Sequence, residues 1–201
     1  IWRGKKMYIL NAWNIEGVQY KEPVLKMNGI EAVRSSTPKV CRDNMKKVLH
    51  IVMNKDEKAL QEFMRNFHEE YMELPFEDIA SPRGVKGMKK YNTDKSQIYD
   101  KGTPIHVKGA LIFNSFIKEK KLSNIPFIND GDKIKFAYLK MPNPLRESVL
   151  AVPDKIPDEL KFIESYIDRD LQFDKTFLGP VKSITDIVEW QTEKRLTLDD
   201  F

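Results

Sequence analysis

The chain has 201 residues, of which 41% are hydrophobic and 32% charged, so it is polar but too rich in large apolar side chains to be disordered. One cysteine excludes an internal disulfide framework, and three scattered histidines leave few ligands for a zinc site. The net charge is +4, and no apolar run reaches the roughly 18 residues of a membrane-spanning helix.

The N-terminal third predicts a β-hairpin followed by two helices. Residues 5–13 and 18–26 are two extended apolar runs around a turn at 14–17, with Pro23 near an edge or a strand end. Ser35-Ser36-Thr37-Pro38 predicts a helix start, with a hydroxyl N-cap and proline at the first helical position.

Two apolar stripes at helical spacing follow, and they predict two antiparallel helices separated by a break at residues 54–56. The stripes consist of Cys41, Met45, Val48 and Val52, then Leu60, Phe63, Phe67 and Tyr71. Leu74-Pro75 ends the second helix.

The rest of the chain alternates loops with short elements. Residues 79–102 lose periodicity and predict loops with at most short strands, and a loop this long usually has a function. Residues 106–118 predict a helix that Gly109 weakens, with Leu111 or Ile112, Ser115 and Phe116 facing inward. Residues 133–140 and 148–152 predict paired strands.

Two further helices are expected near the C-terminus. One begins at Pro157-Asp158 and carries Leu160, Ile163 and Ile167, and the other lies beyond Pro180. The predicted class is therefore α+β, mainly helical, with small antiparallel β elements and an N-terminal β-hairpin.

Charge is unevenly distributed along the chain. Residues 1–50 and 83–121 are strongly basic, with net charges of +6 and +7, whereas residues 51–82 and 154–201 each carry −5. A protein that binds a polyanion needs such local density of Lys and Arg. A soluble domain with unevenly charged faces is the other interpretation of the same pattern.

Motifs for catalysis are absent from the sequence: there is no phosphate-binding glycine loop, HExxH or GxSxG. Asp130-Gly131-Asp132 could share a divalent ion, although a tight turn is the simpler explanation. A small hydrolase that uses Asp130 and Asp132 thus remains one hypothesis, to be tested by metal binding of Asp132→Asn.

Six short motifs are spread along the whole chain. They are Lys5-Lys6-Met7-Tyr8, the run 30–38 ending in Ser-Ser-Thr-Pro, Lys90-Tyr91, His106-Val107-Lys108-Gly109, Lys175-Thr176-Phe177 with Pro180, and the ending 196–201. In identity and order this set resembles the end of the palm and the thumb of family B DNA polymerases of T4-like bacteriophages. The chain departs from the pattern at Met7, where relatives often carry arginine, and in a more lysine-rich loop.

The resemblance implies three regions: the C-terminal end of the palm (1–29), the thumb (30–190) and a tail that binds the sliding clamp (191–201). Together with the start at Ile1 without an initiator Met, it leads us to expect a fragment of a replicative DNA-directed DNA polymerase, inactive alone because the catalytic aspartates precede it. The parent enzyme would use Mg²⁺ bound outside this fragment, in the cytoplasm of the infected bacterium.

The resemblance also implies which residues meet primer–template duplex, through phosphates and the minor groove. The implied DNA-binding residues are Lys5, Lys6, Tyr8, Arg34, Ser35, Lys89, Lys90, Lys101, Lys108 and Lys175. Lys5 and Lys6 are expected on a strand, pointing to opposite faces. Arg34 and Ser35 are expected beside a helix N-terminus that can receive a phosphate.

The tail carries three apolar residues among charges, Leu196, Leu198 and Phe201, which the resemblance implies bind the sliding clamp. Partners would be duplex DNA, the clamp and the remainder of the polymerase chain, with no membrane. The alternative is a non-enzymatic nucleic-acid-binding or adaptor module. Such an independent module should bury Ile9, Leu10 and Trp13, whereas a fragment that needs missing palm strands should leave them partly uncovered.

Overall fold

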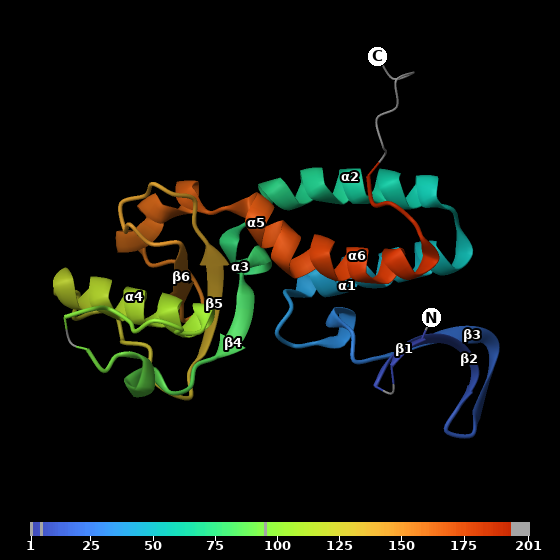
Figure 1. Ribbon diagram of the computed structural model, residues 1–201, viewed down its shortest axis with the longest axis horizontal. Helices are drawn as coiled ribbons and strands as arrows, with labels where there is room; N and C mark the ends of the chain where they lie inside the picture. The colour runs from blue at the N-terminus through green and yellow to red at the C-terminus, as the bar shows by residue number, and fades with distance from the viewer. Residues whose placement is uncertain (1, 5, 95, 194–201) are drawn as a thin grey trace, which may run out of the picture. The chain divides into compact units, whose positions relative to one another are not determined.

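The computed structural model describes residues 2–4, 6–94 and 96–193, and gives only the backbone of residues 2–4 and 7. The fold is α+β, as the sequence predicts. The chain divides into two compact units, the first made of Ile1–Asn66 with Phe177–Phe201 and the second of Phe67–Thr176 (Figure 1). Within the described residues, no helix is long and apolar enough to cross a membrane.

The first unit contains the predicted hairpin. Strands β2 (Met7–Ile15) and β3 (Val18–Asn28) pair antiparallel, and β1 (Trp2–Gly4) adds to β2 to give the order β1-β2-β3. Glu16 and Gly17 both have positive φ, the backbone of a tight hairpin turn. Pro23 lies where the register between β2 and β3 is interrupted on an edge strand, which tolerates a residue without an N–H.

Helices α1 (Lys39–Asn54) and α2 (Glu57–Glu73) match the two predicted stripes and run in opposite directions (Figure 1). The predicted cap of α1 is wrong by one position. Pro38 is the N-cap, because its carbonyl accepts the first helical bond from the Arg42 N–H at 3.0 Å, and no side chain caps the helix. Asp56 starts α2 by accepting the Ala59 N–H at 2.9 Å.

The second unit is built on an antiparallel sheet of β4 (Ser81–Gly84), β5 (Lys133–Tyr138) and β6 (Val149–Val152), in that order. The predicted pairing of β5 with β6 is confirmed, with Phe136 opposite Ala151. All four residues of β6 are buried. Since successive strand residues point to opposite faces, both faces of β6 are covered.

Helix α4 (Ile105–Glu119) covers β6 (Figure 1). Its predicted inward face is wrong in part: Ile112 is buried, together with Val107, Ala110, Phe113 and Ile117, while Leu111, Ser115 and Phe116 are only half-buried. Ser115 and Phe116 instead line a surface hollow of about 540 Å³ with Ile98, Leu145 and Phe162.

The C-terminal helical stretch also differs from the prediction. Residues Asp158–Tyr166 form a 3-10 helix (η3) instead of an α-helix, although Leu160 and Ile163 are buried as expected. Helix α5 (Arg169–Phe173) begins well before Pro180, capped by Asp168, and continues through a π-helical turn at Asp174–Leu178 into α6 (Gly179–Thr185). Pro180 lies in the first turn of α6, where it needs no N–H partner.

Two shorter helices connect elements that are described above. A 3-10 helix, η1 (Glu31–Val33), lies between the hairpin and α1, and α3 (Phe76–Ile79) precedes β4. Gln172 of α5 is buried and connects α5 to α3 and β5 of the second unit. Its amide nitrogen donates to the Ile79 carbonyl at 2.9 Å, and its oxygen accepts the Tyr138 N–H at 3.3 Å. The predicted boundaries after residues 29 and 190 stay predictions.

Candidate nucleic-acid interface

The short helix η2 (Met88–Tyr91) presents two of the predicted lysines. Met88 is buried and anchors η2, while Lys89 and Lys90 are exposed. The Lys90 ammonium lies 5.5 Å from the centre of the Tyr91 ring. No carboxylate in the described part of the chain forms an ion pair with Lys89 or Lys90, so both charges face solvent.

The Asp130-Gly131-Asp132 turn holds η2 in place. Asp130 Oδ1 accepts the Met88 N–H at 2.9 Å, and Asp132 Oδ2 accepts the Asn129 N–H at 2.8 Å. Gly131 has a φ of 101°, as a tight turn with glycine requires. Across the described residues, no group of three or more His, Cys, Asp or Glu side chains is placed to hold a metal ion. The turn therefore has a structural explanation.

The loop after η2 is closed by its own hydrogen bonds. The Asp100 carboxylate accepts the Thr93 N–H at 3.0 Å and the Thr93 hydroxyl at 2.7 Å, and the Asp100 N–H donates to the Tyr91 carbonyl at 2.9 Å. Asp94 accepts the N–H and hydroxyl of Ser96. These bonds lower the pKa of both carboxyl groups: for Asp94 the Ser96 hydroxyl is the largest cause, and for Asp100 the Thr93 N–H. Lys101 follows the loop and is exposed.

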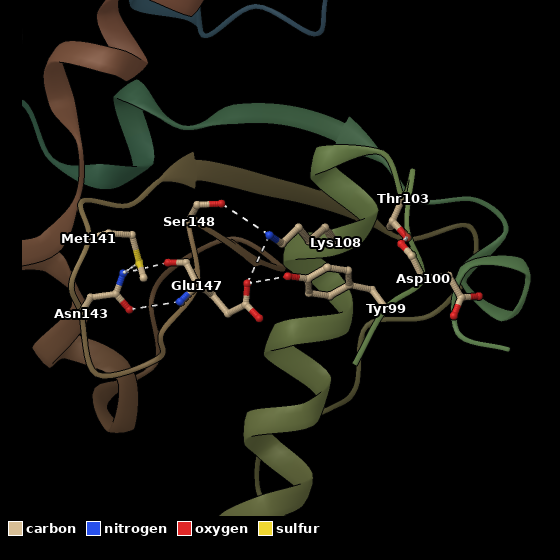
Figure 2. Close-up of polar contacts among 8 residues, drawn as sticks. All are labelled: Tyr99, Asp100, Thr103, Lys108, Met141, Asn143, Glu147 and Ser148. Carbon is tan, nitrogen blue, oxygen red and sulfur yellow. Dashed lines mark hydrogen bonds and ion pairs between the residues drawn. The ribbon is translucent and has the colours of Figure 1, made fainter. Parts of the chain in front are cut away.

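Lys108, on the first turn of α4, has partners inside the protein (Figure 2). Its ammonium lies 3.2 Å from Glu147 Oε2, 3.4 Å from Ser148 Oγ and 4.5 Å from the centre of the Tyr99 ring. Partial burial acts to lower the pKa of Lys108, but hydrogen bonding to Tyr99 and Glu147 and the Glu147 charge outweigh it, so this pKa is raised. Lys108 is therefore charged and internally paired.

The predicted DNA-binding residues of the first unit differ in their exposure and in their partners within the chain. Lys6 is exposed and lies in the turn before β2, so its predicted position on a strand is wrong; Lys5 lies outside the described residues. Tyr8 is half-buried on β2. Arg34 contacts Glu31 Oε1 and donates to the Gly29 carbonyl, both at 3.0 Å, while Ser35 is exposed and does not cap α1.

The ten predicted DNA-binding residues thus divide between the units. Lys5, Lys6, Tyr8, Arg34 and Ser35 belong to the first unit, and Lys89, Lys90, Lys101, Lys108 and Lys175 to the second. Lys175 is exposed in the π-helical turn, 3.6 Å from Asp174 Oδ2. The tail residues Leu196, Leu198 and Phe201 lie outside the described residues.

Apolar side chains remain exposed on the hairpin. Ile9 is 1% exposed, but Leu10 is 38% and Trp13 55% exposed. Val18 and Val24 of β3 are also exposed. A hairpin that leaves several apolar side chains exposed is the pattern expected of a chain segment that packs against a further partner.

Sequence reasoning missed Tyr99, Glu147 and Asn143. Tyr99 and Glu147 are 48 residues apart, so no local spacing relates them. Arg83 and Lys86 were not singled out either, although both are exposed and lie in the basic segment 83–121. The high density of basic residues in that segment could have indicated them as candidate DNA-binding residues.

Comparison with known proteins gives two extended similarities. The DNA-directed DNA polymerase of Enterobacteria phage T4 is 29% identical over 206 residues, covering 98% of this chain and 22% of that polymerase. The DNA-directed DNA polymerase of Escherichia phage RB69 is 32% identical over 202 residues, covering 99% of this chain and 22% of that polymerase. No family model matches the chain.

The similarity to polymerases of T4-like phages that the sequence motifs indicate is therefore confirmed, and it extends over nearly the whole chain. The chain spans about a fifth of the length of the curated relatives it matches, 22% in each case.

Proposed function

We propose that this chain is the part of a replicative family B DNA polymerase that holds primer–template duplex: the end of the palm, the thumb and the clamp-binding tail. The observation that carries the proposal is similarity to two phage DNA polymerases over 98–99% of the chain. The parent protein would be a DNA-directed DNA polymerase of the infected bacterium's cytoplasm, using Mg²⁺ bound outside this chain. The exposed apolar side chains of the hairpin support packing against the remainder of that polymerase.

The proposed mechanism is electrostatic. A polymerase must hold duplex of any sequence, so phosphate contacts and minor-groove features common to all base pairs are the suitable ones. Lys89 and Lys90 are exposed on η2, and Lys101 is exposed after the internally hydrogen-bonded loop that follows η2. Lys6 and Lys175 add further exposed charges. Lys5, Tyr8, Arg34 and Ser35 are proposed to act near the primer terminus.

The test is binding of the chain to labelled primer–template duplex and to single-stranded DNA over a range of salt. We expect a sequence-independent preference for duplex. Because each neutralised phosphate contributes about 0.9 to the slope of log affinity against log salt, Lys89→Ala with Lys90→Ala should reduce that slope by about 1.8.

The matched control is Lys55→Ala with Lys58→Ala, which removes the same charge from exposed sites in the acidic segment 51–82. It should leave the slope nearly unchanged. Equal losses in both double variants would show that only net charge matters and would contradict the proposed interface, as would absence of duplex binding at low salt.

The tail belongs to the same proposal. Leu196, Leu198 and Phe201 would insert into an apolar pocket of the sliding clamp and tether the polymerase. Binding to a phage sliding clamp should disappear in a chain truncated after Gln191, and unchanged binding would exclude the tail.

A further inference from the structure

We propose that Lys108, Tyr99 and Glu147 form a positioning cluster. This cluster holds η2 and the loop after it, called here the lysine-bearing loop because they carry Lys89, Lys90 and Lys101, in the DNA-binding conformation. We further propose that Lys108 does not itself contact phosphate. The inference rests on the proposed function, since the loop's task is taken from it. The cluster joins three segments: the loop through Tyr99, helix α4 through Lys108, and the β5–β6 connection through Glu147 (Figure 2).

Lys108 has little capacity left for a phosphate. Its side chain is 18% exposed and that of Glu147 is 14% exposed. The ammonium has three N–H donors, and Glu147, Ser148 and the face of the Tyr99 ring surround it. Turning Lys108 outward would leave the half-buried Glu147 carboxylate without its cation, which is unfavourable.

Glu147 is a fixed point for the cluster. The Asn143 amide donates to the Glu147 carbonyl at 2.7 Å and to the Lys140 carbonyl at 2.8 Å, while its oxygen accepts the Leu145 N–H at 3.0 Å. Asn143 is itself buried. The connection between β5 and β6 is therefore held from within, and the Glu147 side chain projects from it to Lys108 and Tyr99 (Figure 2).

Tyr99 transmits this position to the exposed lysines. Its hydroxyl donates to Glu147 Oε2 at 2.9 Å. The next residue, Asp100, bonds to Thr93 through its carboxylate and to the Tyr91 carbonyl through its N–H. Tyr91 is the last residue of η2, which carries Lys89 and Lys90. A continuous series of contacts thus runs from Glu147 to the proposed phosphate-binding lysines.

The decisive variants separate position from charge. Glu147→Gln removes a negative charge, so charge alone would strengthen DNA binding; the positioning role instead predicts binding weakened by at least about tenfold, the scale of one lost hydrogen bond to a charged group. Tyr99→Phe, which changes no charge, should weaken binding similarly. Glu119→Gln is the control, because it removes the same charge from an exposed site on α4 and should not weaken binding.

The salt slope distinguishes a positioning residue from a contact. Lys108→Met should lower affinity without lowering the slope, whereas Lys89→Ala should lower the slope by about 0.9. Lys108→Arg, which keeps the charge near Glu147 and Tyr99, should restore affinity. A slope reduced by about 0.9 in Lys108→Met, or stronger binding by Glu147→Gln, would overturn the proposal.

A second measurement needs no DNA. Hydrogen exchange at the Thr93 and Asp100 amides of the full chain should speed up in Glu147→Gln and Tyr99→Phe but not in Glu119→Gln, because both amides lie within the loop's internal bonds. Unchanged exchange in both cluster variants would overturn the positioning role. If both cluster variants exchange faster but the unmodified chain does not bind duplex, the positioning role of the cluster is supported and the proposed function is contradicted.

Discussion

His106 lies at the start of α4, half-buried, with its ring centre 6.4 Å from that of Phe136. Burial is the larger cause that lowers its pKa from the ordinary 6.5, and the positive charge of Arg83 adds to it. The imidazole therefore stays neutral in the folded protein at pH values where the unfolded chain already binds a proton. Folding is linked to pH through this difference.

The sign of that linkage gives a prediction. Because the folded pKa is depressed, lowering the pH from 6.5 toward the folded pKa should reduce the free energy of unfolding. Urea denaturation should show a shallower decline over this range in His106→Gln. In an NMR titration, Arg83→Gln should raise the pKa of His106. A His106 pKa at or above 6.5 in the unmodified protein would refute the account.

At the scale of elements, the contact between α4 and β6 depends on one glycine. A Cβ placed on Gly109 would lie 2.8 Å from the Ala151 backbone nitrogen and 3.0 Å from the Ala151 Cβ. Both atoms belong to Ala151 of the buried strand β6, so they cannot move aside as the end of a flexible side chain would. Gly109 does not simply weaken the helix, as its intrinsic propensity suggests; it permits the helix to approach the strand.

Gly109→Ala tests which effect is larger. In an exposed helix this change stabilises by up to about 1 kcal/mol, but here overpacking should prevail and lower the free energy of unfolding by about 1–3 kcal/mol. Chemical denaturation measures the difference. Ser115→Ala, on the half-buried side of the same helix, is the control and should change stability by about 0.5 kcal/mol or less. A stabilised Gly109→Ala protein would contradict the close approach.

At the scale of the whole molecule, the chain forms two compact units and still leaves apolar hairpin residues uncovered. Ile9 is buried within the chain, whereas Leu10 and Trp13 are not. This combination meets the expectation for a fragment at two of the three positions. It supports the proposal that the hairpin packs against further polymerase structure.

Substitution at these positions separates internal from external packing. Ile9→Ala should lower the free energy of unfolding by about 2–5 kcal/mol, because it removes a buried side chain. Trp13→Ser should cost about 1 kcal/mol or less, and chemical denaturation of both variants measures the difference. A large loss of stability in Trp13→Ser would show that the Trp13 side chain packs against other residues of this chain.

Local patterns predicted much of the fold because the signals involved span a few residues. The stripes of α1 and α2 follow from a 3.6-residue period, the break between them from the polar residues 54–56, and the β5–β6 pair from alternation. Helix α4 was harder, since its apolar residues occur nearly all around it and the period does not select one face. The 3-10 form of residues Asp158–Tyr166 was not predicted either, because the three-residue spacing of its buried Leu160 and Ile163 fits a 3-10 helix and an α-helix alike.

The candidate site divides in the same way. The density of lysine in residues 83–121 and the motifs shared with phage polymerases were visible in the sequence, and they identify the chain's relatives. The internal pairing of Lys108 was not visible, because Glu147 lies 39 positions further along the chain and comes close through the packing of α4 on β6. Tertiary structure alone makes Lys108 different from Lys89 and Lys90.

The sequence by itself determined the α+β class, the main helices and strands, the basic segments and the similarity to phage DNA polymerases, since all of these depend on residue order and local periodicity. Tertiary structure decided which lysines face solvent, which side of α4 meets the sheet, and why position 109 is glycine. These outcomes depend on contacts between residues far apart in the chain, whose distances no local pattern encodes.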